Sequence, residues 1–335
     1  MTSTPRLTIG LPVFNGENYL ESALSRLLDQ TFEDFDLRIS DNNSNDGTQS
    51  ICERFAATDS RIRYERLEGN VGAIENFNRL SRGVQTEFFK WAAHDDICEA
   101  NYLESCIDAL DNDSGCVWSH STSDLVDEDE TSFLPMLPEE REDIHVDASG
   151  NRSWVGLPRE DYRDSRPHRR FAGVLLGTRW CVDSYGVFRT STLERSGLYP
   201  NVYGSEKVLI GDVSLRGKYA HIDQPLFKQR LHLDASSFRS DSREAQAEYC
   251  NAEPTKSILA STRLRLLNAH LSVVRRSQLS RMERLLCYRV VGAYLLQFRK
   301  WSRVLLGALK GTGISGDAQR NIKSATRREA SHDCG

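Results

Sequence analysis

Residues 7–48 read LTIGLPVFNGENYLESALSRLLDQTFEDFDLRISDNNSNDGT. The apolar run at 7–11 predicts a strand. Between 19 and 28 the apolar residues recur at helical spacing, which predicts an amphipathic helix packed on a sheet. Residues 35–40 predict a second strand, and a polar loop follows it at 41–48. The stretch therefore predicts a strand, a helix and a strand in succession, the repeating unit of a parallel α/β sheet.

The alternation of strand and helix patterns continues to about residue 120. We expect Asn18 and Glu21 to form a capping pair at the start of the first helix. Further strands are expected near residues 62–65, 88–92 and 116–120, with helices between them. The pattern predicts an α/β fold with a mostly parallel central sheet flanked by helices. Such sheets bind ligands beyond the carboxyl ends of their strands.

Three polar segments, at 12–15, 41–46 and 94–96, fall at these predicted strand ends. The last belongs to the stretch FFKWAAHDDIC, in which Asp95 and Asp96 follow an apolar strand. Burial and mutual repulsion both oppose two adjacent carboxylates. A divalent cation or a ligand with several hydroxyls offsets that repulsion, so the pattern indicates a binding site. Acid pairs are also common in solvated turns and helix caps, and the pair alone leaves that alternative open.

The composition is that of an ordinary globular protein. The 335 residues are 39% hydrophobic and 27% charged, and no apolar run reaches the roughly 20 residues of a membrane span. The N-terminus shows no signal-peptide pattern, and we therefore expect a cytoplasmic protein. The eight cysteines form no C-x-x-C pair and no zinc-like spacing, so we interpret them as buried or incidental thiols.

Charge is distributed unevenly along the chain. From Ser261 onward there are 15 Lys and Arg against 4 Asp and Glu, a net charge of +11, whereas the whole chain carries −5. Residues 1–260 therefore carry −16. Apolar and basic residues interleave in the C-terminal part, which suits an anionic membrane surface, packing on the rest of the protein, or packing between two subunits. No recognised motif supports nucleic-acid binding.

The motifs of the first 120 residues resemble those of the family-2 glycosyltransferases, which have the GT-A fold. That family opens with an apolar strand, P-x-Y/F-N, a helix ending in a Q-T/S-aromatic turn, and a strand leading into D-x-x-S-x-D-G-T. This sequence has Pro12, Phe14 and Asn15, then Gln30-Thr31-Phe32, then Asp41, Ser44, Asp46, Gly47 and Thr48. His94-Asp95-Asp96 stands where the family has D-x-D or D-D, with a histidine in place of the first acid.

The resemblance implies roles for these residues. Asp41 would accept a hydrogen bond from the nucleotide base, for which the imide N–H of uracil or thymine is suited. Nucleotide-sugar binding would also involve Pro12, Phe14, Asn15, Asn43 and Asp95. Asp96 would bind Mn²⁺ or Mg²⁺ that bridges the two phosphates and neutralises the leaving diphosphate.

A second group of candidates lies between residues 180 and 237. The family places its catalytic base as an acid at the start of a helix after a glycine-containing or acidic turn, and Gly211-Asp212 is taken as that place. In the alternative interpretation Asp212 only caps the helix. Arg230 would pair with phosphate and His232 would complete the metal shell. Trp180 and Tyr185 either form the acceptor floor or belong to the core.

The expected organisation follows from these assignments. We expect a GT-A domain at 1–240, a helical C-terminal extension at 250–312 and a disordered tail at 313–335. The domain would comprise a nucleotide-sugar half (1–120), a mobile insertion (121–170) and an acceptor half (171–240). The insertion is acidic, proline-bearing and poor in apolar residues, as lids and acceptor-binding loops often are.

The resemblance implies a metal-dependent, inverting glycosyltransferase of the hexosyltransferase class. It would move a sugar from a UDP- or dTDP-sugar to a hydroxyl of a glycan or glycolipid in cell-envelope biosynthesis. The expected location is the cytoplasm, with peripheral contact to the inner face of the membrane or a homodimer through the C-terminal helices. The alternatives are a nucleotidyltransferase, for which the glycine-rich basic phosphate loop is missing, and a non-catalytic nucleotide-sugar or glycan-binding protein of the same fold.

Overall fold

The computed structural model describes residues 4–132, 144–146, 152–154, 161–178, 181–232, 246–247, 249–251 and 262–296. Its strands are β1 (Leu7–Val13), β2 (Phe35–Asp41), β3 (Ile62–Arg66), β4 (Phe88–Trp91), β5 (Ile97–Cys98), β6 (Cys116–Val126), β7 (Ile144–Val146), β8 (Arg152–Trp154), β9 (Val187–Arg189) and β10 (Lys218–Arg230). Its α-helices include α1 (Leu20–Leu28), α2 (Thr48–Thr58), α3 (Ala73–Ser81), α4 (Tyr102–Asn112), α5 (Pro167–Ala172), α6 (Thr190–Glu194), α7 (Glu206–Ser214), α10 (Thr262–Arg276) and α11 (Arg281–Leu295).

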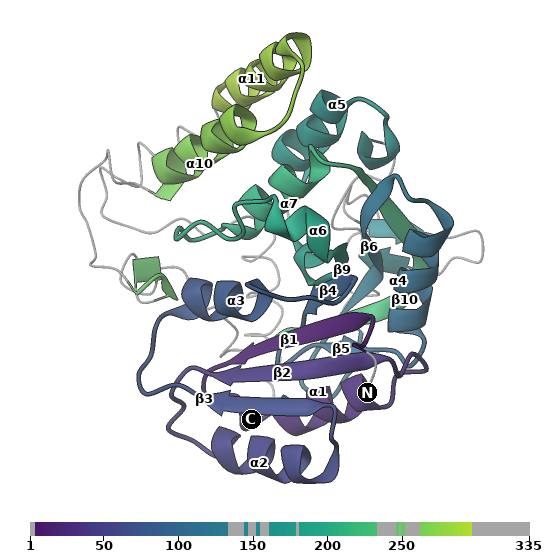
Figure 1. Cartoon of the computed structure of the whole chain (residues 1–335), viewed down its shortest axis with the longest axis vertical. Coiled ribbons are helices and arrows are strands. Elements are labelled where there is room, and N and C mark those ends of the chain that lie inside the picture. Colours follow the sequence, from purple (N-terminus) through teal and green to yellow (C-terminus); the bar gives the residue numbers. More distant parts are fainter. Residues whose placement is uncertain are drawn as a thin grey trace, which may run out of the picture.

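The strands form one central sheet in the order β3-β2-β1-β4-β9-β6-β10-β5 (Figure 1). Strands β3, β2, β1 and β4 run parallel to one another, and β10 runs parallel to β6. The short strand β9 is antiparallel to both of its neighbours, and β5 is antiparallel to β10. The prediction of a mostly parallel sheet is confirmed, with short reversed strands in its second half.

Helices cover both faces of this sheet, as the alternation of patterns predicted. Apolar residues of α1, α2 and α4 pack with β1 and β2 in one core cluster, and those of α3, α6 and α7 pack with β4 and β6 in another. All seven residues of β1 are buried, which is typical of a strand enclosed on both faces. Each large apolar side chain buried in this way contributes about 1.5–3 kcal/mol to stability.

The expected capping pair at the first helix is wrong. Helix α1 begins at Leu20, and no side chain caps its start. The Leu20 backbone N–H instead donates to the Gly16 carbonyl at 3.0 Å. Glu21 accepts hydrogen bonds from Arg54 of α2, the shorter at 2.7 Å, and is therefore committed to a contact between helices.

The insertion expected from residue 121 starts later in the structure. Strand β6 continues to Val126 because β10 pairs with it as far as Arg230. Ser121, Thr122 and Ser123 are polar but buried, so the hydrophobic pattern does not show the strand. The short strands β7 and β8 pair with each other, and β8 joins β6. Residues 161–170 of the insertion are also described and include the start of α5, whereas residues 133–143, 147–151 and 155–160 lie outside the described residues, as does the tail at 313–335.

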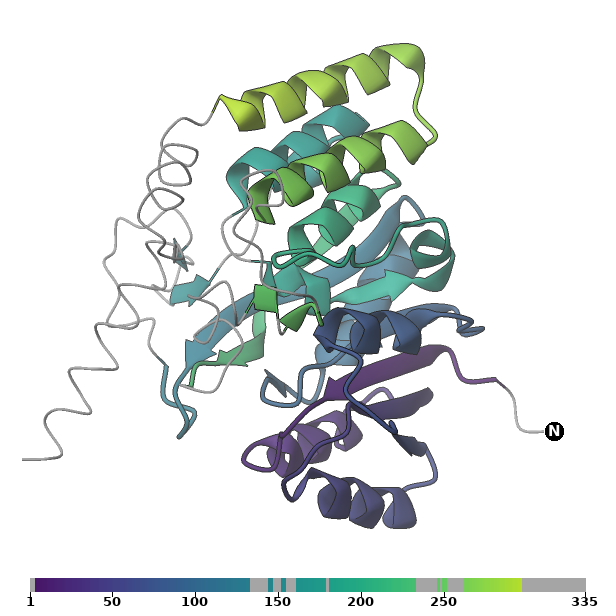
Figure 2. The same cartoon turned by 90° about the vertical axis from the view of Figure 1, so that its left-hand side faces the viewer.

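The C-terminal helices α10 and α11 pack on the domain rather than standing apart from it. A third core cluster joins their inner faces to α5 and α7. Figures 1 and 2 show α11 as the outermost layer at the end of the molecule opposite α2. Among the described residues, no helix combines the length and the apolar character that crossing a bilayer requires.

Candidate active site

The loops after β1 and β2 form one polar rim at the carboxyl edge of the sheet. The Asn15 backbone N–H donates to Ser44 Oγ at 2.9 Å, and the Asn45 N–H donates to Asn15 Oδ1 at 2.9 Å. Asn15 and Asn43 have φ values of +53° and +64°, a left-handed conformation that asparagine tolerates better than most residues. Phe14 projects from this rim with 41% of its surface exposed.

Asp41 ends β2 beneath the rim and is fully buried. Its Oδ1 accepts from the Ser44 N–H at 2.8 Å and its Oδ2 accepts from the Tyr64 hydroxyl at 2.9 Å. Burial, the hydrogen bond to Asp41 and the charge of Asp41 together raise the pKa of Tyr64, so Tyr64 stays a donor. Asp41 therefore fixes the shape of the loop, and its predicted contact with a base stays a prediction. Pro12 is buried in β1 opposite Ser40.

Asp95 and Asp96 lie in the loop between β4 and β5, next to the end of β10. Asp96 Oδ1 accepts from the Arg230 backbone N–H at 3.1 Å, and Asp95 Oδ2 lies 3.0 Å from His232 Nε2. Burial and then the charge of Asp95 raise the pKa of Asp96 well above its usual range. Burial alone would raise the pKa of Asp95 too, but nearby histidines lower it. Asp95 is thus the carboxylate of the pair that favours the ionised form, whereas Asp96 resists ionisation.

The rim and the acid pair lie side by side. The Tyr19 and His232 rings have centroids 4.5 Å apart. A side chain at Gly16 would meet the His94 ring at 2.8 Å, so this contact requires glycine at position 16. The structure therefore brings together most of the predicted site residues, which are Phe14, Asn15, Asp41, Asn43, Asp95, Asp96, Arg230 and His232.

The donor atoms around Asp96 fit a cation that a bound ligand also coordinates. Carboxylate oxygens and imidazole nitrogen suit Mn²⁺, and carboxylate oxygens suit Mg²⁺. His232 Nδ1 is buried and has no hydrogen-bond partner, so it remains available as a ligand. However, no group of three or more His, Cys, Asp or Glu side chains in the described ranges could hold a metal ion by itself. The protein thus offers part of a shell, and the residues do not fit a cation held by the protein alone.

Arg230 is a positioning residue in this geometry. Its side chain is only 4% exposed, and its nitrogens donate to the backbone carbonyls of Asp95 at 3.1 Å and Glu128 at 2.6 Å. A third contact, to Glu130 Oε1, measures 3.4 Å. The predicted pairing of Arg230 with phosphate does not fit, because these contacts engage the guanidinium and join the acid loop to the turn after β6.

Asp212 also differs from its predicted role. It lies inside α7, is fully buried, and accepts from Arg216 at 2.8 Å and from the Gly197 backbone N–H at 2.9 Å. Its Oδ2 also pairs with Arg276 of α10. A catalytic base must reach the proton that it removes. Asp212 has no exposed oxygen, and we correct its assignment from base to structural centre of an ion-pair network.

Glu206, which the sequence analysis missed, is the better candidate. It is the first residue of α7 and follows Gly204, whose φ is +81°. Burial raises the pKa of Glu206, although a hydrogen bond with Tyr249 works against the shift. The expected pattern, an acid at the start of a helix after a glycine-containing turn, describes Gly204-Ser205-Glu206. Gly211-Asp212 lies in the interior of the same helix and does not meet it.

Two tyrosines connect Glu206 to the acid pair. Burial, followed by the charge of Asp96 and an interaction with Tyr249, raises the pKa of Tyr185. Burial and then the charge of Glu206 raise the pKa of Tyr249. Tyr185 therefore lies within electrostatic range of Asp96 and Tyr249, and Tyr249 within range of Glu206. Tyr185 also packs against both core clusters, as the core interpretation predicted, so its place in an acceptor floor stays a prediction, and Trp180 lies outside the described residues.

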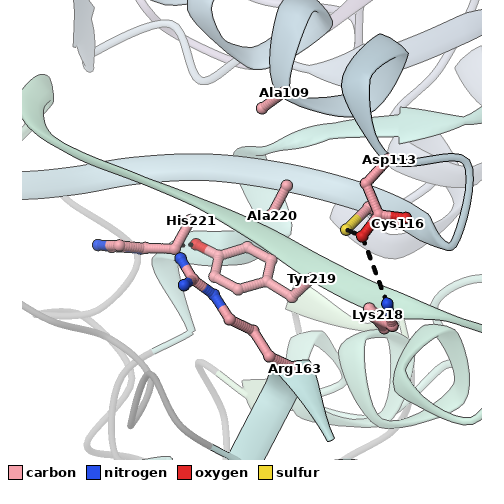
Figure 3. Close-up of a pocket in the computed structure, with 8 residues that line it drawn as sticks. All are labelled: Ala109, Asp113, Cys116, Arg163, Lys218, Tyr219, Ala220 and His221. Carbon is pink, nitrogen blue, oxygen red and sulfur yellow. Dashed lines mark hydrogen bonds and ion pairs between the residues drawn. The ribbon is translucent and has the colours of Figure 1, made fainter. Parts of the chain in front are cut away.

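A separate cavity of about 290 Å³ lies at the opposite end of the strands (Figure 3). Its lining includes Lys218 and Asp113, which form an ion pair at 3.4 Å, and Arg163 and His221. Lys218 is the first residue of β10, whereas the acid pair contacts its last residue. At about 3.3 Å per residue, roughly 30 to 40 Å separates the two places, so this cavity is not part of the candidate active site.

Comparison with known families identifies what the first part of the chain resembles. Residues 8–148 match the family model described as glycosyl transferase family 2. This segment is similar to glycosyl transferase family 2. The match spans the rim and the acid pair, and it confirms the resemblance found in the sequence motifs.

Curated relatives of the family-2 segment are bacterial. An uncharacterized glycosyltransferase of Rickettsia typhi is 27% identical over 141 residues, which is 42% of this chain and 43% of the relative. The putative glycosyltransferase EpsH of Bacillus subtilis is 23% identical over 238 residues, or 70% of this chain and 58% of EpsH. TuaG of Bacillus subtilis, a putative teichuronic acid biosynthesis glycosyltransferase, is 28% identical over 38% of this chain and 50% of TuaG. This chain thus spans less than two thirds of each of these relatives.

Solved structures share the fold of most or nearly all of this chain. Residues 1–349 of Staphylococcus aureus TarS, in complex with UDP-GlcNAc, match with a TM-score of 0.60 and 14% identity, covering 91% of this chain and 76% of TarS. The mannosyltransferase PcManGT of Pyrobaculum calidifontis, in complex with GDP-Man and Mn²⁺, matches with a TM-score of 0.51 and 14% identity. The match covers 98% of this chain and 81% of PcManGT. The predicted GT-A fold is confirmed.

Proposed function

We propose that this protein transfers a sugar from a nucleoside-diphosphate sugar, with UDP or dTDP as the nucleotide, to a hydroxyl of a glycan or glycolipid. One observation carries the proposal. The rim and the acid pair, Asp95 and Asp96, meet at the carboxyl edge of the sheet, within the segment that matches the family-2 model. Parallel α/β sheets bind ligands at this edge.

The donor would lie across the rim toward the acid pair. Phe14 is exposed and offers a ring face to a nucleobase, and the backbone around Asn15 and Asn43 offers polar groups to the base and ribose. Asp41 would accept the imide N–H of uracil or thymine after a small opening of the loop. The UDP-GlcNAc in the TarS complex supports a nucleotide-sugar donor for this fold.

Asp96 would hold a divalent cation together with the diphosphate, and His232 would contribute its free Nδ1. When bound, the cation would neutralise the charge that grows on the leaving diphosphate. Binding a cation would also relieve the repulsion that opposes ionisation of Asp96 beside Asp95. Mn²⁺ in the PcManGT complex supports this assignment, and either Mn²⁺ or Mg²⁺ suits the donor atoms.

Glu206 would act as the general base. Its raised pKa makes it a stronger base than an ordinary carboxylate, as removal of a proton from an acceptor hydroxyl requires. The hydroxyl oxygen would attack the anomeric carbon from the face opposite the diphosphate, and its proton would pass to Glu206. A single displacement of this kind inverts the anomeric centre. Tyr185 and Tyr249 would line the path between Glu206 and the acid pair.

Calorimetric titration with UDP, dTDP and GDP, each with and without Mn²⁺, tests the donor proposal. We expect Mn²⁺ to strengthen the binding of UDP or dTDP, and we expect GDP to bind more weakly. A nucleotide-sugar screen by thermal shift would then identify the sugar. The proposal fails if no nucleoside diphosphate binds with or without Mn²⁺, a result that favours a glycan-binding protein of the same fold.

The relatives support a role in making cell-envelope polysaccharides, since TuaG is named for teichuronic acid biosynthesis. We extend that role to this protein as part of the proposal. A location on the cytoplasmic side, where nucleotide sugars are available, also stays a prediction.

A further inference from the structure

Helix α11 has one face that packs on the protein and one that nothing described covers. On the inner face, Cys287, Val291 and Tyr294 are buried in the cluster that includes Phe171 of α5. The helix is the outermost layer of the molecule in both views (Figures 1 and 2). Its outer face therefore points away from the sheet and from the candidate active site.

The outer face of α11 and its C-cap is apolar and cationic. Every exposed residue between 281 and 296 is either apolar or an arginine. The list is Arg281, Met282, Leu285, Tyr288, Arg289, Leu295 and Leu296. At about 100° per residue these positions fall within roughly 140° around the helix axis, so they share one side of the helix. We call this set the outer face.

Exposed apolar residues are concentrated here to an unusual degree. Seven large hydrophobic residues are exposed in the described part of the chain, and five of them belong to the outer face. Met282, Leu285 and Leu296 are 64%, 57% and 65% exposed. Single exposed apolar residues are ordinary, but a contiguous group bordered by polar residues marks an interaction surface.

The outer face also excludes acidic residues. Glu283 is the only acid between 281 and 296, and it turns toward the protein. Its Oε2 lies 2.8 Å from His168 Nδ1 and accepts from the His168 backbone N–H at 3.2 Å. The single negative charge of the helix is thereby held away from the outer face, which leaves Arg281 and Arg289 without an acid on their own surface.

We propose that the outer face binds the surface of an anionic lipid bilayer. A helix lies in the plane of a membrane when its apolar side chains enter the boundary of the acyl chains and its basic side chains meet anionic headgroups. The outer face offers both kinds of side chain. The sequence supports the same partner, because residues 261–335 carry +11 and the remainder carries −16.

The alternative occupant, a second copy of this chain, fits less well. Two outer faces brought together around a twofold axis would oppose arginine to arginine with no acid to pair. Charge repulsion of this kind costs binding energy at a desolvated interface. An anionic membrane instead complements every charge on the outer face.

Cosedimentation of the full-length protein with vesicles tests the proposal. One set of vesicles contains phosphatidylcholine alone, and another includes about 30 mol% phosphatidylglycerol, in about 0.1 M salt. We expect binding to the anionic vesicles, little binding to the neutral ones, and release at high salt. Replacing Arg281 and Arg289 together with glutamine should weaken binding roughly 25-fold, since each basic residue near an anionic surface contributes a factor of about 5.

The contribution of the apolar side chains of the outer face is tested by a variant that combines Leu285→Gln and Leu296→Gln. This variant should bind anionic vesicles about 10-fold more weakly, or weaker still. Both side chains are exposed, and the variant should unfold at the same temperature as the wild type. Arg63→Gln with Arg195→Gln is the matched control, since it removes the same charge from exposed positions elsewhere. Val71→Gln is the apolar control, and we expect both controls to bind as the wild type does.

Hydrogen exchange of the wild-type protein gives a measurement that needs no substitution. Peptides from 281–296 should gain protection when anionic vesicles are added. The proposal is overturned if the protein does not bind anionic vesicles, or if it binds them equally after the outer-face substitutions. A dimer in solution that the leucine variant converts to a monomer, with vesicle binding unchanged, would assign the outer face to a second copy.

Discussion

Replacing Asp212 with asparagine separates its structural role from the catalytic role first predicted for it. The substitution keeps the size of the side chain but removes its charge. An oxygen in the place of Oδ2 can still accept from the Gly197 N–H and from Arg276, but the new amide N–H group would then face the guanidinium of Arg216. We therefore expect the protein to become less stable while the chemistry at Glu206 continues.

The magnitude follows from the burial of the network. Asp212 is fully buried and Arg216 is 10% exposed, and removing one partner of a buried ion pair costs about 3–5 kcal/mol. The Arg276 side chain is 37% exposed, so water screens part of that second pairing. We therefore expect Asp212→Asn to lower the free energy of unfolding by about 3 kcal/mol, the lower end of this range. At about 2–4 °C per kcal/mol, the melting temperature should fall by roughly 6 to 12 °C.

Differential scanning calorimetry measures the stability, and the release of UDP or dTDP from the donor measures turnover well below the melting temperature. We expect turnover within about 3-fold of the wild type. Asp111→Asn is the control, because Asp111 pairs with Arg6 at an exposed site and its loss should cost less than about 1 kcal/mol. An Asp212→Asn protein with unchanged melting temperature and turnover reduced 100-fold or more would refute the reasoning and restore Asp212 as the base.

Three further predictions concern single carboxyl groups. Glu206→Gln should lower turnover about 10²- to 10⁴-fold in the donor-release assay while calorimetry shows unchanged UDP affinity, and turnover within a few-fold of the wild type would contradict the base assignment. Asp96→Asn should abolish the Mn²⁺-dependent part of UDP binding, whereas unchanged calorimetric affinity in Mn²⁺ would remove Asp96 from the metal site. Burial raises the pKa of Asp183 to about 7, so the folded protein keeps a proton that the unfolded chain loses from about pH 4 upward. This group should therefore lower the free energy of unfolding as pH rises from about 4 to 7, by up to about 4 kcal/mol, and urea titrations of Asp183→Asn should lack that part of the slope.

The first half of the fold is predictable because its signals are local. Strands β1 and β2 and helix α1 show the periods of a buried strand and an amphipathic helix within a few residues of sequence. The buried residues of α1 are Leu20, Ala23, Leu24 and Leu27, which belong to the predicted apolar face. The polar loops could be placed at one edge of the sheet because parallel strands end on the same side.

The second half of strand β6 could not be predicted from its local sequence. The predicted strand ends at residue 120, yet the polar side chains of Ser121, Thr122 and Ser123, which the prediction gave to the insertion, are buried like those before them. Ser119 Oγ donates to the Cys106 carbonyl at 2.9 Å, and His120 Nδ1 lies 2.6 Å from the Tyr102 hydroxyl. Polar groups can be buried when such partners exist, but the partners come from α4 and are not visible in the pattern of β6 itself.

The sequence analysis chose Asp212 and not Glu206 as the candidate base for a similar reason, because the partners of these two acids are not visible in the local sequence. The two acids lie six residues apart in one helix, so they point in different directions around its axis. The helical period shows that the two side chains point in different directions, but it does not show which of them would point toward the candidate active site. Arg276, 64 residues away in α10, pairs with Asp212, whereas the partner of Glu206 is the uncharged Tyr249. The fully buried Asp212 is engaged by an arginine from another helix, and only the three-dimensional arrangement reveals that partner.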